Sequence, residues 1–118
     1  MIGKIYNNKP VTEAQEISEK YQVIESDDFL DFISENSFLI DLISEAEKAV
    51  KRYFQSPKLF LQVVTDKEDP ADTKLVISIC PVEAPKEAFD KLKQLRQDWW
   101  FDASEASEDK LALTLRYR

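Results

Sequence analysis

The chain has 118 residues and a net charge of −7, from 23 Asp and Glu side chains against 16 Lys and Arg side chains. This length suits one domain, and 43% hydrophobic residues place the chain among globular rather than disordered proteins. An acidic surface repels phosphate backbones, and no segment reaches the ~18–20 apolar residues that a membrane span needs. We therefore expect neither a nucleic-acid partner nor a membrane-bound protein.

The missing residue types exclude most catalytic chemistry. The chain has no His, and Gly3 is its only glycine, which removes His-based triads and metal sites as well as glycine-rich phosphate loops. Cys80 is the only cysteine. We expect it to be a small buried hydrophobic side chain, with no internal disulfide and no thiolate zinc site. Because the N-terminus lacks a signal-peptide pattern, we expect a cytoplasmic protein, and no cofactor is assigned.

We interpret the whole chain as one domain, 1–118, whose first half is helical. Residues 1–10 are a tail or a short edge strand, and residues 11–56 form the helical part. The apolar positions of a first helix recur at steps of three and four residues, at Ala14, Ile17, Tyr21 and Ile24. Residues 26–28, Ser-Asp-Asp, supply the cap and acidic first turn of a short second helix. Between 39 and 54 one broad apolar face predicts the strongest helix.

Residues 58–118 are predicted to form a β-β-α-β unit. The run 59–64 is apolar at nearly every position and 75–80 is rich in β-formers, so both are expected strands. The acidic connection 66–72 is local, which favours antiparallel pairing. Pro85 is well placed to start a helix.

Within that unit, the helix after Pro85 has a core stripe of Ala88, Leu92, Leu95 and Trp99. Residues 102–109 read as a solvated loop, and Leu111, Leu113, Leu115 and Tyr117 alternate with smaller or polar residues, as in a strand with one wet face.

The predicted fold class is α+β, with N-terminal helices followed by a three-stranded, mainly antiparallel sheet that helices cover. We favour the strand order 2-1-3, with the last strand beside the first, because the most apolar strand then lies in the middle. The alternative places the last strand beside the second, as a parallel β-α-β pair.

Carboxylates are the remaining candidates for chemistry. Asp27 and Asp28 are assigned to helix capping. The loop that holds Asp66, Glu68, Asp69 and Asp72 offers oxygens to a hard cation, but its spacing matches no EF-hand and a solvated loop is the preferred interpretation. Asp98 and Asp102 lie one helical turn apart, a spacing that permits a carboxylate pair. No metal-binding or catalytic residue is assigned.

The adjacent Trp99 and Trp100 point about 100° apart on a helix, so a core position for Trp99 puts Trp100 on the flank. The residues along that flank are Phe89, Lys93, Arg96 and Trp100. In one interpretation Trp100 packs over a sheet edge with Arg96 stacked on its ring. In the other, these four residues form an aromatic and arginine patch that binds a protein partner or a second copy of the chain.

The C-terminal half, from Lys58 to Arg118, resembles a group of small bacterial, often cyanobacterial, proteins. These share a strand, an Asp-containing loop, a strand, a helix started by Pro, an Asp-x-Trp-Trp motif and a final strand. Asp98-Trp99-Trp100 stands at the place of the motif here, without the intervening residue. The resemblance implies this order of elements, and it implies no activity and no site residue.

The expected function is that of a small acidic cytoplasmic domain for protein interaction or regulation, without catalytic activity. The alternative is a carboxylate-dependent, metal-assisted hydrolase. That alternative predicts a concave site where Asp66, Asp69 or Asp98 converge.

Overall fold

The computed structural model describes residue 17, residues 19–69 and residues 71–116, so the predicted tail or strand at 1–10 lies outside the described residues. In chain order the elements are β1 (Gln22–Val23), α3 (Ser26–Glu35), α4 (Leu39–Tyr53), β2 (Lys58–Thr65), β3 (Thr73–Cys80), α5 (Pro85–Leu95), the π-helical turn η1 (Arg96–Trp100), α6 (Phe101–Ala106) and β4 (Leu111–Leu115). The α+β class is confirmed. No helix in the described part of the chain is both long and apolar enough to cross a membrane.

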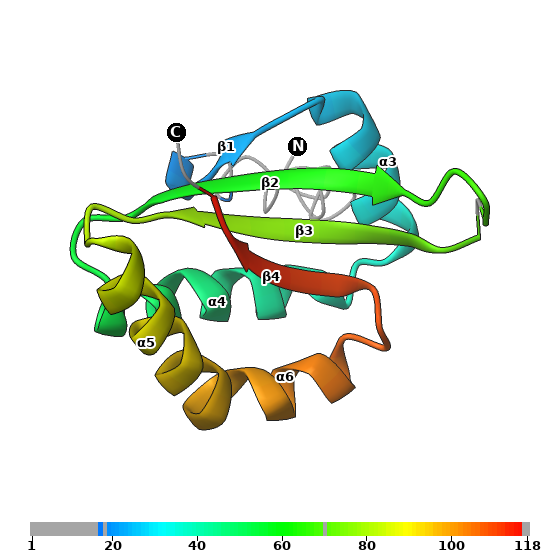
Figure 1. The fold of residues 1–118 in the computed structure, drawn as a ribbon. Helices are drawn as coiled ribbons and strands as arrows, with labels where there is room; N and C mark the ends of the chain where they lie inside the picture. The colour runs from blue at the N-terminus through cyan, green and yellow to red at the C-terminus, as the bar shows by residue number, and fades with distance from the viewer. Residues whose placement is uncertain (1–16, 18, 70, 117–118) are drawn as a thin grey trace, which may run out of the picture.

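The four strands form one mixed sheet in the order β1-β2-β3-β4 (Figure 1). β2 and β3 pair antiparallel along their whole length, from Lys58 opposite Cys80 to Thr65 opposite Thr73. β1 is parallel to β2, and β4 is parallel to β3. The sheet therefore has one strand more than the sequence predicts and is mixed rather than mainly antiparallel.

The favoured strand order, with the last strand beside the first, is wrong. β4 lies beside β3 and parallel to it, as in the alternative order. Two features explain this arrangement. β1 and α3 occupy the outer side of β2, so β4 has no place there. The connection 85–106, which contains α5, η1 and α6, is long enough to return the chain to the start of β3, as a parallel crossover requires.

The first helix does not continue to Ile24 as predicted. Lys20 is still helical, but the chain then bends and Gln22–Val23 forms β1. The Ile24 N–H donates to the carbonyl of Leu61 at 2.8 Å, and Glu25 follows with a positive φ of 54°. β-branched residues at 23 and 24 favour an extended backbone, so pairing with β2 replaces the last helical turn.

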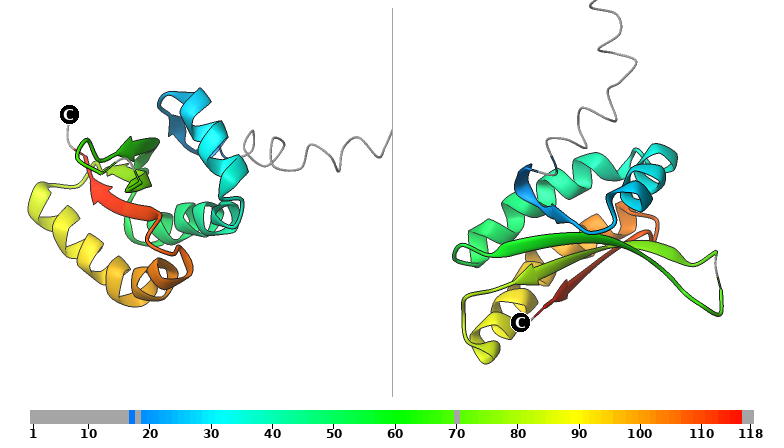
Figure 2. Two further views of the ribbon diagram at one scale, coloured as in Figure 1. Left: turned by 90° about the vertical axis from the view of Figure 1, so that its right-hand side faces the viewer. Right: turned by 90° about the horizontal axis from the view of Figure 1, so that it is seen from above.

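The core lies between the sheet and three helices. α4, α5 and α6 cover one face, while α3 packs beside β2 (Figures 1 and 2). Leu61 and Ile77 of the central strands are fully buried on the covered face. The broad apolar face predicted for α4 is confirmed by seven buried apolar residues, beside which Glu47 is also buried. On the opposite face, Gln62 and Ser78 are half-buried and Thr114 is exposed.

The predictions for Cys80 and Pro85 are confirmed, whereas the loop predicted before β4 is wrong. Cys80 is buried and Pro85 is the first residue of α5, both as expected. The solvated loop predicted at 102–109 is wrong, because α6 occupies its first half. No Gly or Pro interrupts this segment, and Ala103 is buried in the core, so the helix gains a packing face.

Candidate functional site

The α5–η1 segment is joined to α4 along one of its two flanks. The Tyr53 hydroxyl of α4 donates to the Asp98 carboxylate at 2.5 Å, and Gln94 Nε2 donates to the same carboxylate at 3.0 Å. The bond from Tyr53 is the main reason that the pKa of Asp98 lies below its usual value. The same bond raises the pKa of Tyr53. This flank is therefore engaged within the molecule.

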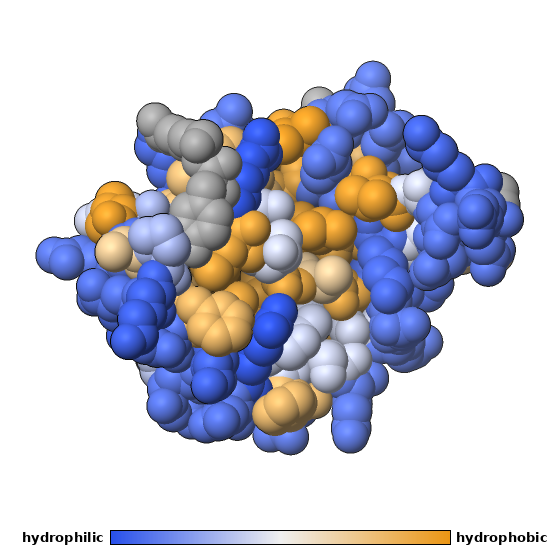
Figure 3. All heavy atoms as spheres, viewed as in Figure 1, coloured by the Kyte–Doolittle hydropathy of each residue, from blue (hydrophilic) through white to orange (hydrophobic). Residues whose placement is uncertain are grey.

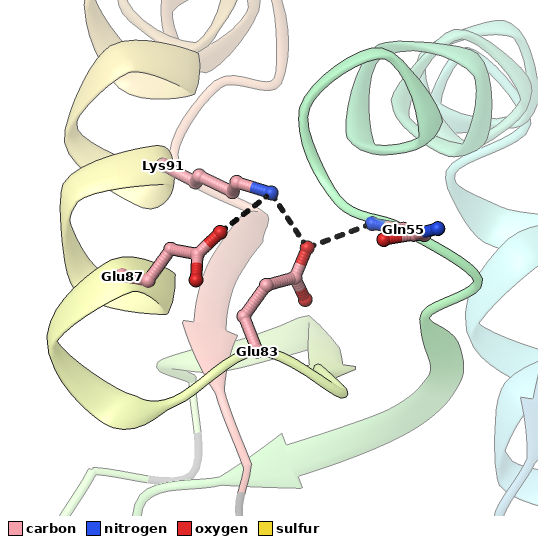
Figure 4. A network of polar contacts seen from close by, with 4 residues as sticks. All are labelled: Gln55, Glu83, Glu87 and Lys91. Carbon is pink, nitrogen blue, oxygen red and sulfur yellow. Dashed lines mark hydrogen bonds and ion pairs between the residues drawn. The ribbon is translucent and has the colours of Figure 1, made fainter.

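Glu83 provides a second link on the same side, shown in Figure 4. Its Oε2 accepts from Lys91 Nζ at 2.7 Å and from the Gln55 backbone N–H at 2.8 Å. Lys91 Nζ also lies 3.4 Å from the exposed carboxylate of Glu87. The Glu83 side chain is only 5% exposed, and among the described residues its Oε1 has no partner. Burial acts to raise the pKa of Glu83, but the bonds from Lys91 and from backbone N–H groups outweigh burial and hold the pKa below its usual value.

The π-helical turn η1 changes how the two tryptophans lie. A π turn adds one residue to a helical turn, and both Trp99 and Trp100 are half-buried and pack against the core. Their ring centroids are 5.9 Å apart and the ring planes are tilted by 42°. Trp99 is therefore a core contact, as predicted, but it is not fully enclosed, and Trp100 also contacts the core.

The other flank holds the four residues singled out from the sequence. The Phe89 side chain is 54% exposed, and Lys93 Nζ lies 5.9 Å from the centre of its ring. Arg96 and Trp100 are half-buried. In the view of Figure 1, apolar side chains gather among hydrophilic ones across the middle of the molecule (Figure 3).

Arg96 reaches the sheet rather than the neighbouring tryptophan. Its Nη2 donates to the backbone carbonyl of Leu113, in the middle of β4, at 3.2 Å. The stacking of Arg96 on Trp100 that one interpretation predicted is not observed. Among the described residues, the cation–π contacts are those of Lys93 with Phe89 and of Arg116 with Phe60, the latter at 4.6 Å. The flank is thus tied to the last strand of the sheet by one side-chain hydrogen bond.

A shallow groove of about 280 Å³ lies between α4 and the η1–α6 segment. It is lined by Leu42, Glu45, Asp98, Trp99, Asp102 and Ala103. Asp98 and Asp102 do share this groove, but Asp98 is already hydrogen-bonded to Tyr53 and Gln94. Within the described ranges, no group of three or more His, Cys, Asp or Glu side chains could hold a metal ion.

The acidic β2–β3 loop uses two of its carboxylates to stabilise its own backbone. Asp66 Oδ1 accepts from the Glu68 N–H at 2.8 Å, and Asp69 Oδ1 accepts from the Ala71 N–H at 3.2 Å. The loop projects beyond the helices and away from η1 (Figures 1 and 2). Asp66 and Asp69 therefore do not converge with Asp98, and the concave site that the hydrolase alternative predicts does not form.

Asp27 and Asp28 lie in the first turn of α3, as the sequence predicts. The predicted capping role of residues 26–28 is wrong, because the N-cap is Glu25, which makes no side-chain capping bond, and Ser26 is already the first residue of the helix. Together with Val23 and Glu25, the two aspartates line an open hollow of about 540 Å³ beside β1. Carboxylates suit the positive end of the helix dipole, and this position explains both aspartates without a ligand.

The comparisons with known proteins add no family. No family model, no curated protein and no solved structure matches the chain. The resemblance of the C-terminal half to small bacterial proteins stays a prediction, and the candidate site rests on its geometry alone.

Sequence reasoning missed three parts of this region. The buried Glu83 has a detectable signal, since Glu83, Glu87 and Lys91 recur at four-residue steps around the start of a helix. The link between Tyr53 and Asp98 joins residues 45 positions apart and has no local signal. The position of β4 beside β3 also has none, because it depends on the strand order.

Proposed function

We propose that the chain is a small, acidic, non-catalytic domain for protein interaction or regulation, and that the flank of Phe89, Lys93, Arg96 and Trp100 contacts its partner. The observation that carries this proposal is the difference between the two flanks of α5–η1. The flank facing α4 is occupied by Glu83, Tyr53 and Gln94, whereas the opposite flank leaves a phenylalanine more than half exposed.

The composition of the flank that holds Phe89, Lys93, Arg96 and Trp100 supports the same proposal. Aromatic rings and arginine are the side chains that most often dominate the binding energy of protein interfaces. Trp100 is held against the core, so it loses little conformational entropy when a partner binds. A cytoplasmic location is also proposed, and the single free, buried Cys80 is consistent with a reducing compartment.

Phe89 and Phe101 provide a matched test of this proposal. Both phenylalanines are more than half exposed, but only Phe89 belongs to the proposed flank. A tagged full-length chain is used to capture partners from cells of the source organism, and light scattering measures its size in solution. We expect Phe89→Ala and Trp100→Ala to lose the captured partner or the self-association, and Phe101→Ala to keep it.

The result that would contradict the proposal is a monomer for which neither Phe89→Ala nor Trp100→Ala changes solubility or any captured partner. Trp100 contacts the core, so its variant is checked for folding by circular dichroism. Phe89→Ala removes a mainly exposed ring and keeps the test decisive if Trp100→Ala unfolds.

A further inference from the structure

Among the strands that the structure describes, β4 is the last of the sheet, and its outer edge pairs with none of them. The bonds from the Leu75 N–H to the Lys110 carbonyl and from the Arg116 N–H to the Ile79 carbonyl mark the two ends of the β3–β4 ladder. In a parallel ladder, alternate residues direct both backbone groups to the neighbouring strand. The even-numbered residues of β4 therefore direct their backbone N–H and C=O groups to β3. The residues whose N–H and C=O groups point outward are Leu111, Leu113 and Leu115.

Most of these outward groups have no strong partner in the described part of the chain. The Leu113 carbonyl accepts from Arg96 at 3.2 Å, and the Leu115 carbonyl accepts only a long bond of 3.4 Å from the Thr114 hydroxyl. An open row of backbone groups is a template on which another strand can pair. The sequence of β4, Leu-Ala-Leu-Thr-Leu, carries no proline or charge to prevent such pairing.

Arg96 covers one acceptor of this edge, the Leu113 carbonyl. Its guanidinium has five N–H donors and no acceptor, and the contact with Leu113 uses a neutral carbonyl. A carboxylate is a stronger partner for arginine, because two parallel charge-assisted bonds can form. A strand that brings a carboxylate to Arg96 would therefore draw the guanidinium from Leu113 and free that carbonyl for the ladder.

The positive charge near this edge also favours a partner that carries a carboxylate. The chain as a whole is strongly acidic, yet the side chain that reaches this edge is Arg96, and Lys93 precedes it by one helical turn on the same flank. Within the described residues neither of these two cations forms an ion pair, whereas Lys74 and Lys91 do. Arg116 is directed over the Phe60 ring of β2 and does not contribute to the edge. The edge thus presents backbone donors and one arginine without a carboxylate partner in that part of the chain, beside a flank that carries Lys93 and the half-exposed ring of Phe89.

We propose that the outer edge of β4 binds an extended segment of a protein partner that carries an Asp or Glu side chain, which pairs with Arg96. The segment adds a strand through the backbone groups of Leu111, Leu113 and Leu115, a recognised mode of peptide binding. This inference rests on the proposed interaction function and names the chemistry of the partner segment. A second copy of the chain is the less favoured occupant, because a two-fold arrangement about Leu113 would bring two Arg96 side chains together.

Short random peptides displayed on phage are the probe, selected on the full-length chain. Selected peptides are then synthesised with the carboxylate intact or replaced by its amide, and binding is measured by fluorescence anisotropy. We expect the selected peptides to alternate apolar residues with one carboxylate, and amide replacement to weaken binding about tenfold, as the loss of a charge-assisted bond implies. Arg96→Gln should weaken the acidic peptide to the same extent. Arg52→Gln, which changes an exposed arginine on α4, should leave binding unchanged.

NMR of the backbone amides shows directly where on the chain the peptide binds. Adding the acidic peptide should shift the NMR amide signals of Leu111, Leu113 and Leu115 and slow their hydrogen exchange. If no peptide is selected, or if peptides bind equally to the Arg96→Gln variant and leave these amides unchanged, the edge proposal is wrong. If the binding of such peptides is still weakened by Phe89→Ala, the interaction function stands and only the edge assignment fails. If the molar mass of the chain in solution doubles as its concentration rises, and the peptide does not dissociate this dimer, the edge belongs to a second copy and the proposal is overturned.

Discussion

Two glutamates share one lysine but differ in burial, and this difference decides their energetic role. Glu83 is 5% exposed and accepts from both Lys91 and the Gln55 backbone, whereas Glu87 is 59% exposed and only lies near Lys91. Charged hydrogen bonds that are shielded from water contribute more to stability than surface ion pairs. Glu83 therefore connects the end of α4 to the start of α5, and Glu87 adds little to that connection.

Replacing Glu83 by glutamine should lower the free energy of unfolding by about 2 kcal/mol near neutral pH, because Lys91 and the Gln55 N–H lose a charged acceptor. The matched change Glu87→Gln should cost no more than about 0.5 kcal/mol. Urea unfolding of both variants and the unchanged chain measures the two costs. Equal costs would contradict the assignment.

The pH dependence follows from the direction of the Glu83 pKa. Because the folded-state pKa lies below the ordinary value of 4.5, the stabilisation by Glu83 is complete above that value and is lost as the pH falls through the lower folded-state pKa. The stability difference between the unchanged chain and Glu83→Gln should therefore shrink as the pH falls below about 4.5.

Sequence could place the residues of the candidate flank but not their contacts. Helical spacing alone puts Phe89, Lys93, Arg96 and Trp100 on one side. The contact of Arg96 with Leu113 could not be predicted, because it requires β4 to lie at the edge beside β3. With the favoured strand order, the same arginine would have met a different surface.

At the scale of elements, the π turn η1 is the feature that the sequence did not reveal. It adds a residue where α5 passes into α6, so that Trp99 and Trp100 both contact the core while Ala103 returns to the buried stripe. The longer elements were predictable because their apolar spacing is regular, as in α4, β2 and β3. β1 and α6 were not, because two residues give no periodicity and a six-residue helix of mostly polar and small residues resembles a loop.

Deletion of Gln97 tests the role of the extra residue. Gln97 is exposed, and because a π turn holds one residue more than an α turn, removing it should return the segment to a regular α-helix and leave the later residues in the same phase. We expect Ala103 to keep its buried position and the unfolding free energy to change by no more than about 1 kcal/mol, whereas a loss of about 2 kcal/mol or more would mean that the core contacts depend on the π turn itself. The near-ultraviolet circular dichroism of the tryptophan pair would then change as well. Gln97→Ala keeps the chain length and should stay within about 0.5 kcal/mol.

At the scale of the whole molecule, fold class was predictable and strand order was not. An α+β class follows from the separation of helical and strand patterns along the chain. The order was undetermined because the alternation in β4 suits either neighbour. What decides the order is that β1 and α3 already occupy the side of β2, and β1 comes from a segment that reads as the end of a helix. The two residues of β1, which are distant from β4 in the sequence, thus determine the position of β4 in the sheet.

The fully paired β2–β3 hairpin has a consequence for how the chain reaches this fold. Its two strands are separated only by residues 66–72, whereas β4 can join β3 only after the segment 81–110 has been ordered. Loop closure costs less for the nearer pair, so the hairpin should form before the rate-limiting barrier and β4 should dock after it. In stopped-flow kinetics, Ile77→Val should mainly slow folding, with a φ-value above about 0.5, and Leu113→Ala should mainly speed unfolding, with a φ-value below about 0.3. The reverse pattern would mean that the parallel pair β3–β4 forms first. In the expected order, the edge of β4 that we propose for partner binding is the last part of the sheet to form and the first to be lost.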